Sequence, residues 1–163
     1  MRNPMSVHIE TRNFNRHIRS FLRGTHVDTE KAIKKFAFDL LKKIIKKNPV
    51  NKEVGHGGRS RAGWFVAIEA LGGSESGIAS GNVSEIREGK ALGGFTDNTK
   101  TIGNQWIEII NGVSYILFLE YGHSGQAPFG MARLSMREMR RGQLPQDMTR
   151  RMQRRWKQFY YQG

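Results

Sequence analysis

The stretch TEKAIKKFAFDLLKKIIKKNP, residues 29–49, decides the fold of this chain. Its apolar residues recur every three or four positions, the spacing that lines one face of an α-helix, and no glycine interrupts them. These positions are Ile33, Phe36, Ala37, Leu40, Leu41, Ile44 and Ile45. Asp28 or Thr29 suits the N-cap, and Asn48-Pro49 ends the pattern because the residue before a proline avoids helical backbone angles. The stretch predicts a long amphipathic helix over 28–48.

Other elements are expected on the C-terminal side of this helix. The segment NQWIEII (104–110) predicts a strand that ends at the turn pair Asn111-Gly112. Two further segments, RAGWFVAIEAL (61–71) and MARLSMR (131–137), alternate apolar and polar residues with a period of two, which also predicts strands. After Leu144-Pro145 we expect a last helix with an apolar stripe of Met148, Met152 and Trp156.

The segment SYILFLEYG (114–122) suits either a buried strand or a short helix. Ser114 as N-cap and Gly122 in a left-handed conformation favour the helix. Residues 72–103 are rich in Gly, Ser, Asn and Thr, with a weak strand expected between Ile78 and Ile86, so we expect a mobile insert there.

The predicted fold class is α+β, with a small mixed or antiparallel sheet packed against the long helix. The expected division of the chain is an N-terminal arm (1–26), a core domain (27–141) and a basic C-terminal helix (142–163).

The composition narrows the class of protein. The chain has 163 residues, no cysteine and a net charge of +13. The absence of cysteine excludes disulfides and thiolate metal sites. No apolar run is long enough to span a bilayer, and the first residues lack the apolar centre of a signal peptide, so we expect no membrane partner and no secretion. The excess of positive charge indicates a polyanionic partner, either nucleic acid or an acidic protein surface.

The segment FLEYGHSGQAPFG (118–130) gathers the residues that most resemble a catalytic site. Ser124, His123 and Glu120 are the residue types of a hydrolase triad, but adjacent residues in a turn point in different directions. Five scattered histidines offer no metal-ligand spacing, and no pair of carboxylates stands out. We therefore expect neither an enzyme nor a cofactor. Gly122, with the later Gly and Pro residues, indicates a shaped bend that Glu120 and Tyr121 tie down by hydrogen bonds.

The same segment is similar to a known family. YILFLEYGHSGQAPFGMARLSMREM (115–139) resembles the tail-completion or neck proteins of long-tailed bacteriophages, whose segment reads Tyr-Ala-x-x-Leu-Glu-Tyr-Gly-(His/Thr)-Ser and then Ala-Pro. Upstream, Pro49, Val50, Arg61, Gly63 and Trp64 fall on the family's Pro-Val-x-x-Gly-x-(Leu/Arg)-Arg-x-(Ser/Gly)-Trp pattern. The resemblance covers residues 28–140. Ile116 stands where the family usually has alanine, and residues 51–55 depart from its Asp-Thr-Gly turn.

The resemblance implies a structural virion protein of the phage neck, assembled in the host cytoplasm. Such subunits form a ring, here expected as a hexamer with a dodecamer as the alternative, that joins the tail to the portal. The expected partners are other copies, adjacent neck, portal, adaptor or tail-terminator proteins, and the packaged DNA in the lumen. The expected interface residues are Trp64, Tyr115, Glu120, Tyr121, Gly122, His123, Ser124, Gln126, Ala127 and Pro128.

The basic residues of the last third allow two partners. By chemistry, DNA phosphates and acidic neighbouring proteins are equally suitable partners for Arg133, Arg137, Arg140, Arg141, Arg150, Arg151, Arg154 and Arg155. The need for DNA to pass freely through the lumen favours the contacts with acidic proteins. The rival hypothesis is a stand-alone basic DNA-binding protein, supported by the charge and by the aromatic and basic mixture in RRMQRRWKQFYY (150–161). It predicts affinity for free duplex that falls steeply with salt. A ring component should bind free duplex weakly at physiological salt and form a discrete oligomer.

Overall fold

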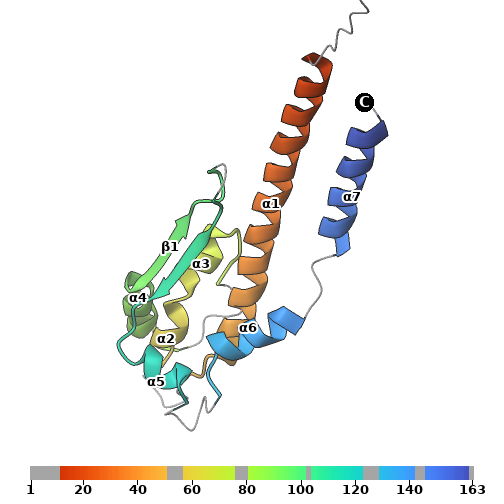
Figure 1. The fold of residues 1–163 in the computed structure, drawn as a ribbon. Helices are drawn as coiled ribbons and strands as arrows, with labels where there is room; N and C mark the ends of the chain where they lie inside the picture. Colours follow the sequence, from red (N-terminus) through yellow and green to blue (C-terminus); the bar gives the residue numbers. More distant parts are fainter. Residues whose placement is uncertain are drawn as a thin grey trace, which may run out of the picture. The chain divides into compact units, whose positions relative to one another are not determined.

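The computed structural model describes residues 12–50, 57–75, 81–101, 104–122, 129–141 and 146–161 (Figure 1). In chain order the elements are α1 (Arg12–Lys47), α2 (Arg59–Ala62), α3 (Phe65–Ala70), α4 (Val83–Ala91), β1 (Gly93–Asp97), β2 (Ile107–Asn111), α5 (Ile116–Glu120), α6 (Ala132–Arg141) and α7 (Gln146–Tyr161). The fold is α+β. The chain divides into two compact units: Met1–Thr29 with Leu144–Gly163, called here the helix-pair unit, and Glu30–Gln143, called the core unit.

The predicted long helix is present in α1, and it begins earlier than expected. Helix covers residues 12–27, most of which belong to the expected N-terminal arm (1–26). The helical spacing of Phe14, Ile18, Phe21 and Leu22 continues into the main stretch, and no proline lies between Arg12 and Lys47. The C-terminal end is where the sequence predicts it: the N–H of Asn48 donates to the carbonyl of Ile44 at 2.9 Å, and Pro49 follows.

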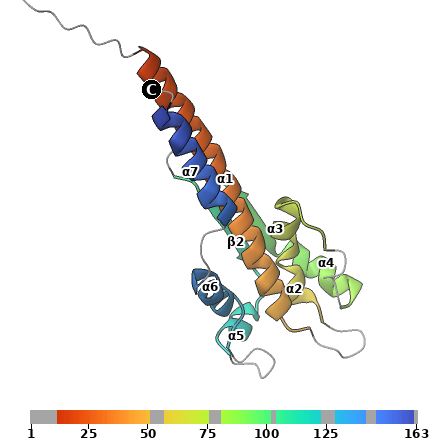
Figure 2. The same ribbon diagram turned by 90° about the vertical axis from the view of Figure 1, so that its right-hand side faces the viewer.

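The helix-pair unit consists of the N-terminal part of α1 and α7, which run in opposite directions (Figures 1 and 2). The rings of Phe21 and Trp156 meet edge to face with 5.7 Å between their centroids. Arg155 forms an ion pair with the buried carboxylate of Asp28. The C-terminal helix expected after Leu144-Pro145 is confirmed by α7.

The core unit is built on the C-terminal part of α1. One cluster joins Leu41 and Ile45 to Phe65 and Ile68 of α3, and the partly buried Phe95 and Ile109 of the sheet pack against it. The sheet has two antiparallel strands, paired from Gly93↔Asn111 to Asp97↔Ile107. The strand expected at 104–110 is thus confirmed, displaced by a few residues. The second cluster consists of Ile44, Leu119 and Met131, and it joins α1 to α5 and the start of α6.

Two expected strands are helices instead. In 61–71 the chain forms the end of α2 and then α3, with Ala62, Phe65 and Ile68 buried. This three-residue spacing is helical, and it coexists with the two-residue alternation because the segment is apolar nearly throughout. In 131–137 the chain forms α6, with Met131 and Ser135 buried one turn apart.

The expected mobile insert at 72–103 contains regular structure where it is described. Helix α4 begins after Asn82, whose side chain accepts a hydrogen bond from the N–H of Ser84 at 2.8 Å, and β1 follows. The weak strand expected between Ile78 and Ile86 is therefore wrong from Val83 onward, because the Asn82 cap starts a helix. Residues 76–80 lie outside the described residues.

Candidate interaction surface

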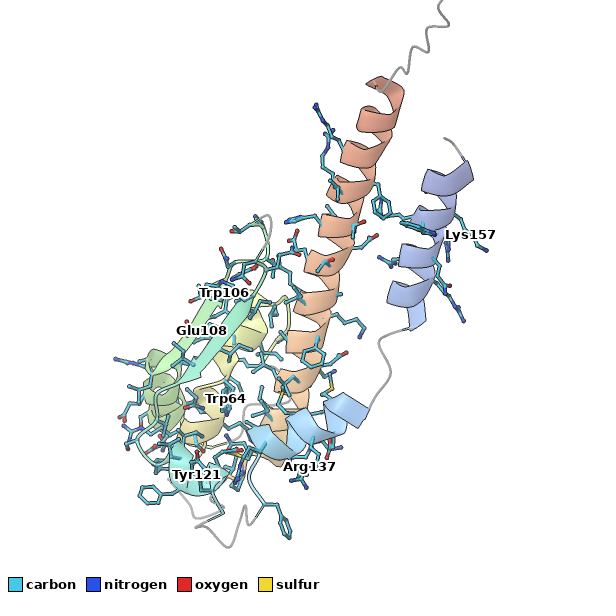
Figure 3. The ribbon with its side chains drawn as sticks, viewed as in Figure 1. Trp64, Trp106, Glu108, Tyr121, Arg137 and Lys157 are labelled. Atoms are coloured by element: carbon cyan, nitrogen blue, oxygen red, sulfur yellow. The ribbon has the colours of Figure 1, made fainter. Side chains whose placement is uncertain are left out.

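Helix α5 carries apolar side chains on both its inner and its outer face. Leu119 is buried and packs with Ile116 in the cluster around Ile44 and Met131. On the other side, Leu117, Phe118 and Tyr121 are each 62% exposed, and Phe129 is 78% exposed. Figure 3 shows the Tyr121 ring directed away from the ribbon. Leu117, Phe118 and Tyr121 are called the α5 patch below, and Phe129 is a further exposed side chain just before Gly130. A cluster of exposed large apolar side chains marks an interaction site on many proteins.

The carboxylate of Glu120 connects the end of α5 to the start of α6. It accepts hydrogen bonds of 2.8 Å from the backbone N–H groups of Met131, Ala132 and Arg133. The Arg133 side chain donates a further bond of 3.2 Å and lies 4.8 Å from the centroid of the Tyr121 ring. Since the first N–H groups of a helix have no partner within it, Glu120 supplies the N-terminal cap of α6 from another element.

Burial raises the pKa of Glu120, but the hydrogen bonds from the Arg133, Met131 and Ala132 backbone and from the Arg133 side chain outweigh it, so the pKa lies below its ordinary value of 4.5. Glu120 makes hydrogen bonds as expected, and they fix the start of α6. Tyr121, for which hydrogen bonds were also expected, contacts Arg133 through its ring. Both carboxylate oxygens are engaged in this cap. Glu120 is therefore a structural support of the α5 patch, with a side chain only 15% exposed.

Two glycines with positive φ flank the bend. Gly122 has a φ of 78°, as the sequence predicts for the residue that follows a short helix, and Gly130 has a φ of 77°. A Cβ at Gly130 would collide with the carbonyl oxygen of Glu120, so the start of α6 can approach α5 only at a glycine. The expected cap by Ser114 is wrong, because the helix begins after Tyr115 without a side-chain cap.

The remaining residues of the expected interface have different positions. Trp64 is half-buried and packs against both core clusters, so it contributes to the fold. Tyr115 is 38% exposed at the start of α5. His123, Ser124, Gln126, Ala127 and Pro128 lie outside the described residues.

The expected basic contacts fall on two elements. On α6, Arg133 is held by Glu120 and Arg137 is exposed, and the side chains of Arg140 and Arg141 lie outside the described set. On α7, Arg150, Arg151 and Arg154 are exposed, whereas Arg155 is paired with Asp28. Arg155 thus forms an ion pair within the chain, whereas the side chains of the other three face solvent.

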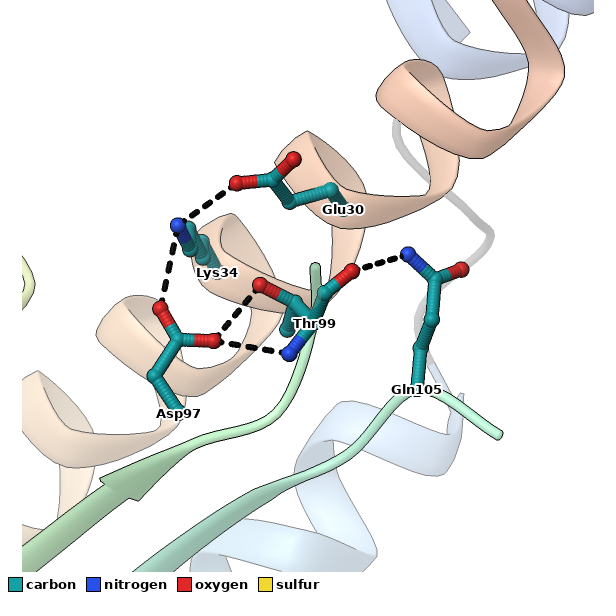
Figure 4. A network of polar contacts seen from close by, with 5 residues as sticks. All are labelled: Glu30, Lys34, Asp97, Thr99 and Gln105. Carbon is teal, nitrogen blue, oxygen red and sulfur yellow. Dashed lines mark hydrogen bonds and ion pairs between the residues drawn. The ribbon is translucent and has the colours of Figure 1, made fainter. Parts of the chain in front are cut away.

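A polar network joins α1 to the loop end of the hairpin (Figure 4). Lys34 contacts Glu30 at 2.7 Å and Asp97 at 3.0 Å, while Asp97 accepts hydrogen bonds from the hydroxyl and the N–H of Thr99. The Thr99 hydroxyl bond is the main reason that the pKa of Asp97 falls to about 2, with further contributions from the Thr99 N–H and Lys34 against the opposing effect of burial. The network holds the sheet against α1, and every charged group in it already has a partner.

Metal-binding and membrane-spanning features are not found in the described ranges. No three His, Asp or Glu side chains there are grouped to hold a metal ion. No helix in the same ranges has the length and apolar character needed to cross a bilayer.

Reasoning from the sequence missed three of the exposed apolar side chains in this region. Leu117, Phe118 and Phe129 were absent from the expected interface. A signal was present: ILFL (116–119) has four consecutive large apolar residues, and a short helix packed on one side can bury only about half of them.

The chain has no match among known proteins in any of three comparisons. No family model, no curated protein and no solved structure gives a match.

Proposed function

We propose that this chain is a ring-forming structural subunit of a bacteriophage neck, which joins the tail to the portal or connector and surrounds the path of the DNA. The α5 patch is the observation that carries the proposal. It lies within the segment that resembles the neck family, and it exposes three large apolar side chains next to Glu120, whose hydrogen bonds fix the start of α6.

The α5 patch suits a subunit contact better than a solvent-facing surface. Leu117, Phe118 and Tyr121 occupy one side of α5, while the other side is fixed in the core by Leu119. A ring needs one surface of each subunit to meet a different surface of the next, and rigid apolar patches provide such contacts. The support under the α5 patch consists of hydrogen bonds, which suits a docking surface more than a reaction centre.

The proposal is tested by complementation of a phage whose genome encodes the chain. Particles made without it should accumulate as separate filled heads and tails, and addition of the purified wild-type protein should restore joining. The double variant L117S/F118S should restore joining at least tenfold less well. Val83→Ser is the matched control, because Val83 is 82% exposed on α4, and it should work as well as wild type.

Three results would reject the proposal: normal particles without the chain, full joining by L117S/F118S, or an equal loss with Val83→Ser. Electron microscopy of the restored particles should show the subunit at the head–tail junction. The stand-alone DNA-binding alternative predicts normal joining without the chain, so the first measurement separates the two hypotheses.

A further inference from the structure

The positive charge of the chain is concentrated in the helix-pair unit. Its residues, 1–29 and 144–163, include ten Lys+Arg against three Asp+Glu, which gives +7 of the total +13. Nine of these ten basic residues are arginines. The core unit, with more than twice as many residues, has the remaining +6 and is richer in lysine than in arginine. The helix-pair unit is therefore the more basic of the two units for its size.

On α7 the basic residues form a stripe opposite the side that contacts α1. Arg150, Arg154 and Lys157 follow the i, i+4, i+7 spacing of one helix face, and all three are exposed. Arg155 and Trp156 instead contact Asp28 and Phe21 of α1. Figure 3 shows Lys157 on the side of α7 away from α1. Lys157 also lines a hollow with Phe21 and Thr25 of α1, so it stands at the edge of the stripe nearest α1.

On α1 a second stripe follows the same spacing. Arg12, Arg16, Arg19 and Arg23 recur at i, i+4, i+7 and i+11, and the side chains of Arg19 and Arg23 are exposed. At about 100° per residue, Phe21 and Asp28 lie roughly half a turn around α1 from Arg19. The two stripes consequently occupy opposite edges of the helix pair.

Another copy of this chain offers little negative charge to neutralise the stripes. Of the eleven acidic side chains that the structure describes, ten already form ion pairs within their own chain: Asp28, Glu30, Asp39, Glu69, Glu75, Glu85, Glu88, Asp97, Glu120 and Glu138. The eleventh is Glu108 on β2. Within the described residues, another copy thus offers only Glu108 as an unpaired carboxylate, which favours a different molecule as the source of counter-charge.

The make-up of the outer side of α7 favours nucleic acid over an acidic protein. Apart from Trp156, the exposed described residues of α7 are Arg150, Arg151, Gln153, Arg154, Lys157 and Gln158, with no aliphatic side chain. Protein interfaces have a core depleted of charge and rich in apolar groups, whereas phosphate contacts need only regularly placed cations. We propose that the helix-pair unit binds the phosphate backbone of duplex DNA through the α7 stripe of Arg150, Arg154 and Lys157, without reading base sequence.

The expected affinity of one copy is modest. Three phosphate contacts give a slope of about −2.7 for log K against log salt, which is roughly a 40-fold loss between 50 and 200 mM. Copies arranged around one duplex would add their contacts. The inference rests on the proposed function for its place in the virion, where this DNA would be the packaged genome, but its test does not depend on ring assembly.

The test measures binding of a fluorescent 30-base-pair duplex by anisotropy between 50 and 200 mM NaCl, with two unrelated duplex sequences. The variant R150Q/R154Q/K157Q should lose at least tenfold in affinity at 100 mM, and its salt slope should fall in magnitude by about 2 to 3. The matched control K31Q/K46Q/K100Q removes three exposed charges from the core unit and should stay within threefold of wild type. Both duplexes should bind equally.

Circular dichroism of both variants checks that helix content is unchanged. Absence of wild-type binding at 50 mM, or equal losses in the two triple variants, would overturn the inference. Displacement of the duplex by polyglutamate at equal charge would also overturn it and assign the stripes to an acidic protein. The mass of the assembled protein should be the same for R150Q/R154Q/K157Q and wild type. Loss of DNA binding with an intact oligomer therefore separates this inference from the proposed ring.

Discussion

At the scale of single residues, Glu120 shows most clearly how the end of α5 is joined to the start of α6. Its carboxylate serves three backbone N–H groups of another element, and Gly130 lets those groups come close. The sequence indicates the hydrogen-bonding role through the position of Glu120 beside Gly122. It does not indicate the partner, because the partner is the start of α6 and that segment has the alternating pattern of a strand. A cap supplied by a residue more than ten positions away produces no local sequence pattern that would predict it.

The pH dependence of stability tests the role of Glu120. Its pKa is lower in the folded chain than in the unfolded chain, so its contribution is present above pH 4.5 and is lost as the pH falls through the folded value. Glu120→Gln should lower the free energy of unfolding by about 1–2 kcal/mol at pH 7. The difference from wild type should shrink by pH 2.5, as measured by urea unfolding. Glu108→Gln on β2 is the control and should change little at either pH. A constant difference would contradict the role.

At the scale of elements, the outcome of sequence reasoning depended on how distinct the apolar period was. Helix α1 has a break-free helical pattern and α7 follows a proline, so both were predicted. The segment around Trp64 was not, because Ala62, Trp64, Val66 and Ile68 alternate like a strand while Phe65 fills the other side. When a segment is buried on more than one side, its apolar residues fit both the two-residue period of a strand and the 3.6-residue period of a helix. The outer face of α5 was missed for the related reason that apolar residues were assumed to be buried.

Trp64 joins the two clusters of the core unit, since it packs against both. Trp64→Ala should therefore lower the free energy of unfolding by about 3 kcal/mol, the lower end for a large aromatic in a core. Trp106, which is 38% exposed before β2, provides the control, and Trp106→Ala should have the smaller effect. Thermal and urea unfolding measure both. If the two variants were equally stable, Trp64 would not have the structural role assigned to it.

At the scale of the whole molecule, the two proposals assign assembly and nucleic-acid contact to different parts of the chain. The α5 patch belongs to the core unit, and the arginine stripes belong to the helix-pair unit. The core unit also pairs nearly all of its described carboxylates internally, so apolar contact is the means it has left for self-association. Under these proposals, a chain with a charge of +13 forms a closed assembly because the contacts between copies avoid its most basic unit.

The native mass of the purified protein is the most direct test of self-assembly through the α5 patch. At tens of micromolar and physiological salt, the wild-type chain should form one discrete closed oligomer, with six copies expected. The variant L117S/F118S should be a folded monomer, and Val83→Ser should assemble like wild type. A wild-type chain that remains monomeric, or an L117S/F118S variant that assembles normally, would contradict the account.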